Sequence, residues 1–220
     1  MLSRNSRRVF ATAALAAALV TSLAACRVEQ GAAVFVGDTR IAASQVDDVI
    51  DTLPTKRQAP MSIFRSSTVD ALTVIELGKQ VADDTGAEPV TAAEETPRQY
   101  WQSQGLKPDS EFVDLMAEAE GYRAMLAEDA EPAEATNDDL DAIIERFERN
   151  SGQKLQERDK AALQQELASE QGKTIIGTRN KLESYVDKYD VTANPRYGDT
   201  YIVVARGSQY EPLVTVPLES

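Results

Sequence analysis

The side chains that could carry out chemistry in this sequence are mainly carboxylates, because it holds 36 Asp and Glu residues, one cysteine and no histidine. Histidine is the commonest general base near neutral pH and a frequent zinc ligand. Its absence excludes a Ser–His–Asp triad, a Cys–His pair and every metal site that includes a histidine ligand. Two kinds of candidate remain: groups of neighbouring carboxylates, and the single cysteine.

The carboxylates gather in four groups along the chain. Such groups could act as acid and base in hydrolysis or bind calcium. None of them has the spacing of an EF-hand loop with its central glycine, and most lie where a helix is expected to begin and negative charge is favourable. We therefore interpret them as surface and capping residues, and the sequence predicts no catalytic residue, no metal ligand and no cofactor. The groups are Asp47, Asp48 and Asp51; Asp83 and Asp84; Glu94 and Glu95; and Asp138, Asp139 and Asp141.

The cysteine, Cys26, ends a segment with the features of a secretory signal. Three arginines precede an apolar run over residues 9–20, which is too short for a comfortable membrane span. The motif Leu23-Ala24-Ala25-Cys26 resembles the lipobox of bacterial lipoproteins, in which the cysteine is acylated and becomes the first residue of the mature chain. An ordinary signal peptide that is followed by a cysteine is the alternative. The resemblance implies a signal peptide over residues 1–25, a lipidated tether over 26–31, and a chain anchored by lipid at the extracytoplasmic face of the cell membrane.

The net charge limits the partners of the chain. It is −13 for the whole sequence, and residues 1–25 contain three arginines and no acidic residue, so residues 26–220 carry −16. A surface this acidic repels phosphate backbones and anionic lipid heads. We therefore expect no nucleic acid partner, and attachment to the membrane through the lipid on Cys26 alone.

Apolar patterns predict a mainly helical body with a small β element. Ala32–Val36 is an apolar run bounded by a turn signal, as in a buried strand. A helix over about residues 63–85 lacks a polar face along its middle and is therefore expected to be the central, buried helix. A longer helix is predicted over residues 157–189, where Gly172 and Gly177 indicate either a close backbone contact or a bend.

Both ends of this body resemble one family. Residues 34–41 (Val-Phe-Val-Gly-Asp-Thr-Arg-Ile), followed by a helix that begins with Ser-x-Val-Asp, are similar to the opening of SurA N-terminal chaperone domains, with Val36 in place of the usual Asn. Residues 191–198 (Val-Thr-Ala-Asn-Pro-Arg-Tyr-Gly) are similar to the end of actinobacterial SurA-like lipoproteins. The resemblance covers about residues 32–53 and 136–205.

The resemblance implies a helical chaperone domain of the SurA N-terminal and trigger-factor C-terminal type over residues 32–206. In that family the two ends of the domain meet. We therefore expect Tyr201–Ala205 to pair with Ala32–Val36, and residues 207–220 to form a C-terminal tail.

By the same resemblance, the domain would hold unfolded or partly folded exported polypeptides in an apolar groove between helices. The chain lacks the parvulin isomerase domain of longer relatives and its histidines, so we expect no isomerase activity and no enzyme. The alternative is a structural lipoprotein that docks one dedicated envelope partner. The candidate client-binding residues are aromatic and methionine side chains, which suit varied apolar segments when exposed but could equally pack in a core: Met61, Phe64, Tyr100, Trp101, Met116 and Met125.

Overall fold

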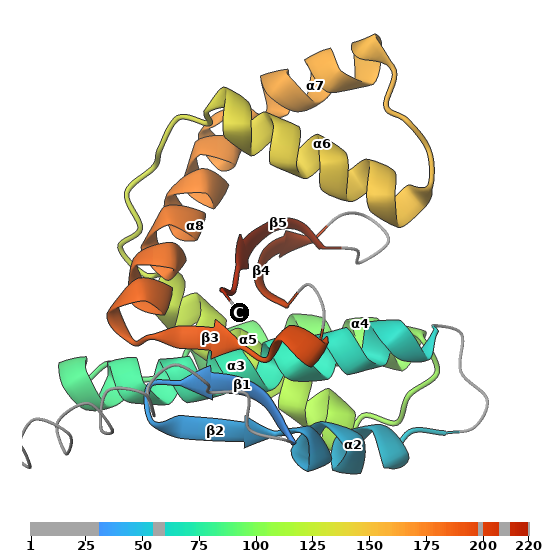
Figure 1. Cartoon of the computed structure of the whole chain (residues 1–220), viewed down its shortest axis with the longest axis vertical. Coiled ribbons are helices and arrows are strands. Elements are labelled where there is room, and N and C mark those ends of the chain that lie inside the picture. The colour runs from blue at the N-terminus through green and yellow to red at the C-terminus, as the bar shows by residue number, and fades with distance from the viewer. Residues whose placement is uncertain (1–30, 55–59, 198–199, 207–211, 220) are drawn as a thin grey trace, which may run out of the picture. The chain divides into compact units, whose positions relative to one another are not determined.

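The computed structural model describes residues 31–54, 60–197, 200–206 and 212–219. The chain divides into Met1–Gly31 and Ala32–Ser220, and all the elements below belong to the second unit (Figure 1). The expected signal peptide, Cys26 and the tether as far as residue 30 lie outside the described residues. Within the described part of the chain, no helix is long and apolar enough to cross a membrane.

The first strands form a three-stranded antiparallel sheet in the order β2-β1-β3. β1 (Ala32–Val36) lies between β2 (Thr39–Ala42) and β3 (Val191–Ala193), and all five of its residues are buried. Gly37 turns the chain from β1 to β2 with a φ of 56°, a left-handed conformation that glycine adopts without strain. The strand predicted at Ala32–Val36 is confirmed.

The predicted pairing of Tyr201–Ala205 with β1 is wrong. That run lies in β4 (Tyr201–Arg206), which pairs with β5 (Pro212–Pro217) as a separate antiparallel hairpin. The expected tail over residues 207–220 differs for the same reason, because it contains β5.

The chain leaves the first sheet at Asn194. Its backbone N–H and its side-chain Nδ2 donate to the carbonyls of Ala33 and Ala32, at 3.0 and 2.8 Å. The next residue, Pro195, has no N–H with which to continue the ladder, and a short 3₁₀-helix, η2 (Pro195–Tyr197), redirects the chain. β3 therefore takes the place beside β1 that the resemblance assigned to the later strand.

The fold is mainly helical, as predicted. α3 is buried along its middle, as expected of the predicted central helix, and it ends at Gly86 with a φ of 76°. The helix predicted over residues 157–189 is divided in two, because Ser169 begins a new helix and its hydroxyl accepts a hydrogen bond from the Gly172 N–H at 3.1 Å. The helices are α2 (Ala43–Asp51), α3 (Met61–Thr85), α4 (Glu95–Ser103), α5 (Glu111–Ala127), α6 (Asn137–Ser151), α7 (Glu157–Leu167) and α8 (Glu170–Lys188), with a 3₁₀-helix η1 at Thr91–Glu94.

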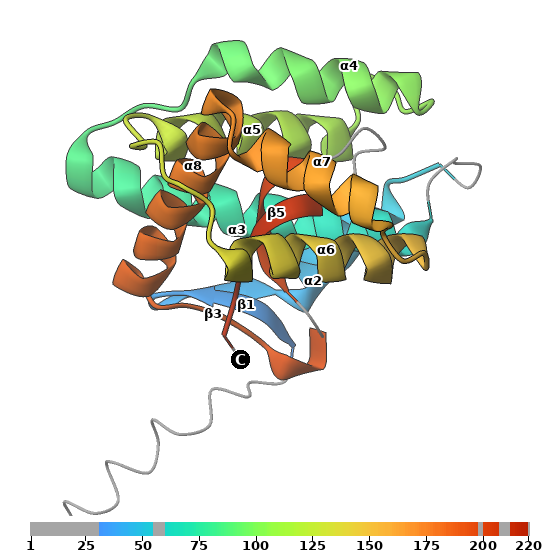
Figure 2. The ribbon, with the colours of Figure 1, turned by 90° about the horizontal axis from the view of Figure 1, so that it is seen from above.

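The hairpin lies between α3 and α6 (Figure 1; Figure 2 gives a second view), and its residues contribute to two hydrophobic clusters. The larger cluster joins the first sheet to α2, α3, α4 and α5, and the hairpin adds Ile202 and Val216 to it. The smaller cluster consists of Ile143, Leu167 and Ile176 from α6, α7 and α8, together with Val214 from β5. α8 also packs directly onto the body, because its Leu182 and Val186 belong to the larger cluster, and the hairpin adds a second connection between the body and α6–α8 through Val214.

Gly172 and Gly177, which the sequence placed in one long helix, both lie at close backbone contacts. A Cβ on Gly177 would overlap the carbonyl oxygen of Glu131, in the segment between α5 and α6. A Cβ on Gly172 would overlap the carbonyls of Glu166 and Leu167 at the end of α7. The first contact lets that segment cross α8 closely, and the second accompanies the break between α7 and α8.

Candidate functional site

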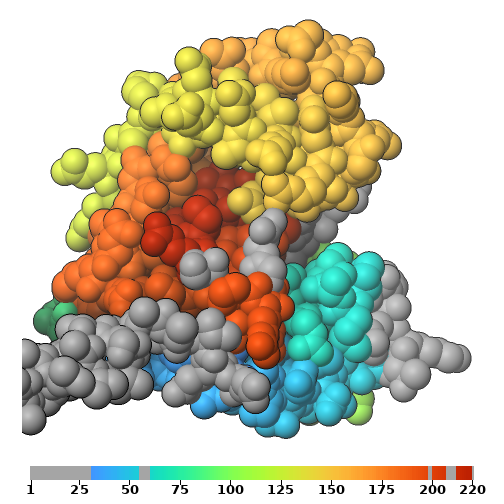
Figure 3. Space-filling model, viewed as in Figure 1, coloured from blue at the N-terminus to red at the C-terminus, as the bar shows by residue number. Residues whose placement is uncertain are grey.

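Two pockets lie beside the β4–β5 hairpin. Pocket 1, of about 230 Å³, lies between β4 and α3, and pocket 2, of about 210 Å³, lies between β5, α6 and α8. In the space-filling view, atoms of the hairpin are visible in a hollow between α6 and α8 (Figure 3). Both pockets are smaller than a typical small-molecule site, but they adjoin along one hairpin.

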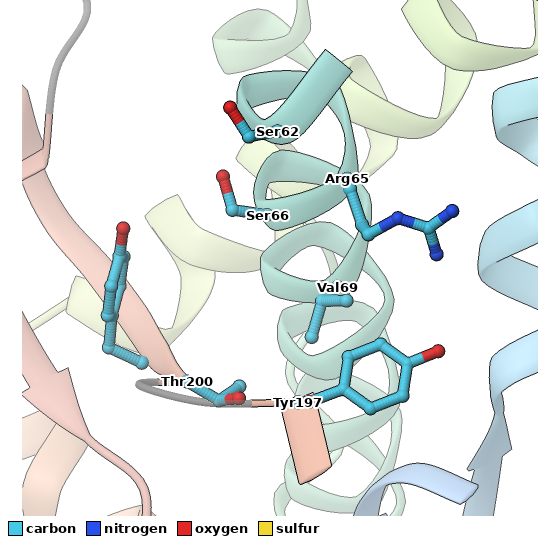
Figure 4. Close-up of a pocket in the computed structure, with 7 residues that line it drawn as sticks. Ser62, Arg65, Ser66, Val69, Tyr197 and Thr200 are labelled. Carbon is cyan, nitrogen blue, oxygen red and sulfur yellow. The ribbon is translucent and has the colours of Figure 1, made fainter. Parts of the chain in front are cut away.

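Pocket 1 is lined by hydroxyl groups above an apolar floor. Ser62, Ser66 and Val69 follow one another along α3, and Tyr197 and Thr200 lie beside them (Figure 4). The spacing of the α3 residues places them on one face of the helix. The pocket therefore offers hydrogen-bond donors and acceptors around a small hydrophobic contact.

Arg65 and Tyr197 form the most polar side of pocket 1. Arg65 pairs with Asp47 of α2, with 2.7 Å between Nη1 and Oδ1. Burial, followed by the negative charge of Asp47, raises the pKa of the Tyr197 phenol, while the charge and hydrogen bond of Arg65 act in the opposite direction. Tyr197 therefore stays a neutral hydrogen-bonding group at neutral pH.

Pocket 2 combines an apolar interior with charged residues from two helices. Ile143 of α6 and Ile176 of α8 belong to its lining and to the smaller hydrophobic cluster. Asp139 is buried, forms the capping box of α6 with Thr136, and pairs with Arg179 of α8 at 2.7 Å. That pair joins the two helical walls across the pocket.

A cation–π contact lies where the two pockets adjoin. The guanidinium carbon of Arg146 is 4.8 Å from the centroid of the Tyr201 ring. Tyr201 lines pocket 1 and Arg146 lines pocket 2. Such contacts contribute roughly 0.5–1 kcal/mol when exposed.

The outer edge of β4 is closed by a buried ion pair. Asp70 of α3 accepts hydrogen bonds from the Val203 N–H at 2.9 Å and from Arg123 at 3.0 Å, and Arg123 of α5 donates to the Val203 carbonyl. Arg206 also pairs with Asp70, at 3.2 Å. The carboxylate and the guanidinium thus bond to Val203 as a neighbouring strand would.

The charge of Arg123 is maintained despite its burial. Burial alone acts to lower the pKa of Arg123, but the charges of Asp70 and Glu120 and their hydrogen bonds outweigh it, so the pKa is raised above its ordinary value. Arg123 therefore stays charged where it bonds to Asp70 and to the Val203 carbonyl.

The six residues predicted to bind clients do not line either pocket. Phe64, Trp101, Met116 and Met125 are buried, and Met61 and Tyr100 pack against the same core. The rings of Phe64 and Trp101 lie 5.4 Å apart, and both pack against Phe112, at 5.1 and 4.8 Å. In this structure their large apolar area packs in or against the centre of the fold, and a client-binding surface made of these residues stays a prediction.

Several of the grouped carboxylates pair with basic residues or cap helices. Asp47 pairs with Arg65, Glu94 pairs with Arg98, and Asp139 caps α6. Asp84 accepts hydrogen bonds from Tyr189 and Lys188, at 2.7 and 3.1 Å. In the described residues, no group of three or more acidic or cysteine side chains is arranged to hold a metal ion.

Sequence reasoning named Asp138 and Asp139 of pocket 2 only as surface and capping residues, and it assigned no binding role to the other residues of the two pockets. They are mainly Ser, Thr, Arg and small apolar residues, which no motif distinguishes. One signal was available: Asp70 interrupts an apolar stretch of α3, and a buried charge requires a partner. Comparison of this chain with known protein families, with curated proteins and with solved structures found no match.

Proposed function

We propose that this chain is a lipid-anchored, extracytoplasmic chaperone-like protein of the SurA N-terminal type, which holds unfolded or partly folded exported polypeptides without isomerase activity. The observation that carries this function is the pair of adjoining pockets along the β4–β5 hairpin. Their apolar floors and polar rims suit short stretches of chain with varied sequence better than one rigid ligand.

Holding requires only that apolar client segments exchange water for the pocket floors. This contributes about 25 cal/mol per Å² of apolar surface buried, less the entropy of ordering the client. The small size of the pockets predicts weak and broad binding. The net charge of −16 on residues 26–220 favours basic clients through long-range attraction.

Suppression of aggregation tests this function directly. The purified full-length chain is added to a chemically denatured basic protein and, separately, to a denatured acidic protein, and light scattering is followed after dilution. We expect scattering to fall for both, and at lower ratios for the basic protein. An unchanged signal at several-fold molar excess would contradict holding, and acceleration of proline isomerisation in a test peptide would contradict the absence of isomerase activity.

The anchor and the range of partners are tested in cells. Cys26→Ser is expected to move the chain out of the membrane fraction, because the acyl chains supply the attachment. Crosslinking in native membranes is expected to recover many different polypeptides. Recovery of one partner alone would instead indicate a structural lipoprotein that docks a dedicated envelope protein.

A further inference from the structure

The backbone of Thr215 points out of the hairpin, away from β4. Val203 pairs with Thr215 in the antiparallel register, and both polar backbone groups of Val203 are bonded on the outer side, to Asp70 and Arg123. In an antiparallel pair, residues opposite each other direct their N–H and C=O groups either both toward or both away from their partners. The Thr215 N–H and C=O therefore lie on the free edge of β5.

The bond between Leu218 and Thr200 supports this orientation. The Leu218 N–H donates to the Thr200 carbonyl at 3.0 Å, so the backbone groups of this pair point into the hairpin. Along both strands, successive residues then direct their N–H and C=O groups alternately outward and inward. Pro217, opposite Tyr201, then falls on an outward position, where its missing N–H removes no bond of the hairpin. A proline at such a place is typical of an edge strand.

The free edge of β5 faces pocket 2. Leu213, Thr215 and Pro217 line that pocket opposite α6 and α8. Among the described residues, no hydrogen bond joins Thr215 to α6, α8 or any other element outside the hairpin. Thr215 itself is only 8% exposed, so the edge presents one donor and one acceptor inside the pocket, where an occupant reaches them by entering between α6 and α8.

The rim of pocket 2 also carries two carboxylates without a cation. Asp138 of α6 and Glu183 of α8 are exposed and line the pocket, and within the described part of the chain neither forms an ion pair, whereas Asp139 is paired with Arg179. The pocket is also lined by Arg179, which is paired with Asp139, and by Arg146, which lies over the Tyr201 ring. With the acidity of the whole chain, Asp138 and Glu183 favour a lysine or arginine in whatever occupies the pocket.

We propose that the free edge of β5 binds an extended, basic segment of a client polypeptide as an added strand, with Thr215 supplying the backbone hydrogen bonds and Asp138 and Glu183 selecting a basic side chain. Alternate residues of a strand point to opposite faces, so an aliphatic residue beside the lysine or arginine contacts Ile143 and Ile176. This proposal rests on the holding function proposed above. It specifies the conformation and the charge of the client segment that is held.

Thr215→Pro removes the proposed donor while keeping the hairpin bonds. The Thr215 N–H faces outward, so its loss breaks no bond to β4, and extended backbone is compatible with proline at this edge position. Thr215→Val is the matched control, because it changes the side chain and keeps the N–H. Asp138→Asn combined with Glu183→Gln tests the charge.

The probe is a short fluorescent peptide in which valine alternates with lysine and threonine, bound to the full-length chain and followed by anisotropy. Two further peptides carry backbone N-methyl groups on the valines or on the alternate residues, so that each loses the amide donors of one edge only. We expect one methylated peptide to bind about tenfold more weakly than the other, and Thr215→Pro to weaken binding of the parent peptide about tenfold while Thr215→Val does not. We expect the charge variant to remove the preference for lysine over glutamate peptides.

The outcomes separate the added strand from the holding function. Equal binding of the two methylated peptides, or equal binding by Thr215→Pro and the unmodified chain, overturns strand addition and leaves holding intact if aggregation is still suppressed. Failure of the unmodified chain to bind the peptide while it still suppresses aggregation overturns strand addition alone, and failure in both assays overturns both proposals. A dimer that Thr215→Pro converts to a monomer, without peptide binding, assigns the edge to a second copy of the chain and also overturns the added strand.

Discussion

The two edges of the β4–β5 hairpin differ in whether their backbone groups have hydrogen-bond partners. On the β4 side, Asp70 and Arg123 bond to the N–H and C=O of Val203, and their side chains are only 1% and 9% exposed. On the β5 side, the opposite residue, Thr215, faces a pocket and has no such partners among the described residues. An edge strand that stays unpaired invites another chain, so closing one edge and leaving the other open directs any added strand to β5.

The largest expected effect comes from breaking the closed edge. Arg123→Met leaves Asp70 buried beside a backbone carbonyl without its main cation, and removal of one partner of a buried pair destabilises a protein by about 3–5 kcal/mol. We expect this loss in the free energy of unfolding measured by urea denaturation. Glu120→Gln is the control, because Glu120 is the more exposed partner of Arg123 and should have a small effect. Equal losses in the two variants would show that the Asp70–Arg123 pair does not dock the hairpin.

Two single variants, each with proline at one member of the Val203–Thr215 pair, compare the stability of the two edges directly. Val203→Pro removes the N–H that donates to Asp70, and a hydrogen bond to a charged group contributes about 1.5–3 kcal/mol. Thr215→Pro removes an N–H without a partner in the hairpin, and because Thr215 is only 8% exposed, the packing lost with its side chain is measured separately by Thr215→Val. Beyond that packing loss, Thr215→Pro should destabilise the fold less than Val203→Pro. Thermal or urea unfolding of both variants tests the difference. A larger loss for Thr215→Pro would reverse the assignment of the open and closed edges.

Much of the fold could be predicted from local pattern. β1, α3 and the helical class follow from apolar spacing and from turn signals such as Gly37 and Gly86, because these features act within a few residues of the chain. The strand over Tyr201–Ala205 could also be predicted, but its partner could not. The pairing of this strand with β5 depends on the direction in which the chain leaves η2, and no local sequence pattern specifies that direction.

The candidate site was less accessible to sequence reasoning. Aromatic and methionine residues such as Phe64 and Trp101 attract attention, but their large apolar area is most valuable in a core, where the structure places them. Thr215 is unremarkable in the sequence and gains its importance from the register of the hairpin and from Val203 opposite it. A backbone group has no residue-type signature, so an open strand edge becomes visible only in three dimensions.

A smaller effect on stability is expected from a change in α8, one of the two helices that line pocket 2. Gly177→Ala places a methyl group against the carbonyl of Glu131, and relief of such overlap costs about 1–3 kcal/mol. The change should displace the segment between α5 and α6, whose Ala133 N–H bonds to the Lys173 carbonyl at 3.0 Å, without touching the closed edge. Urea unfolding measures the loss, with Thr174→Ala on the exposed face of α8 as the control. Equal stability of the two variants would mean that the segment moves freely away.

The smallest effect is expected at an exposed ion pair that, unlike Asp70–Arg123, remains in water. Asp84 near the end of α3 accepts from Tyr189 and Lys188 at the end of α8, and these hydrogen bonds, first that of Tyr189 and then that of Lys188, together with the charge of Lys188, lower the pKa of Asp84. Because its pKa is lower in the folded state, the contact stabilises the fold above the unfolded pKa of about 3.9 and is lost as the pH falls through the folded value. Asp84→Asn should therefore lower the unfolding midpoint slightly at pH 7 and have no effect in strong acid, whereas Asp83→Asn, which forms neither contact, should show no such convergence. A difference that persists in acid would mean that the amide loses packing or geometry, and that solvent-exposed charge contributes nothing at this junction.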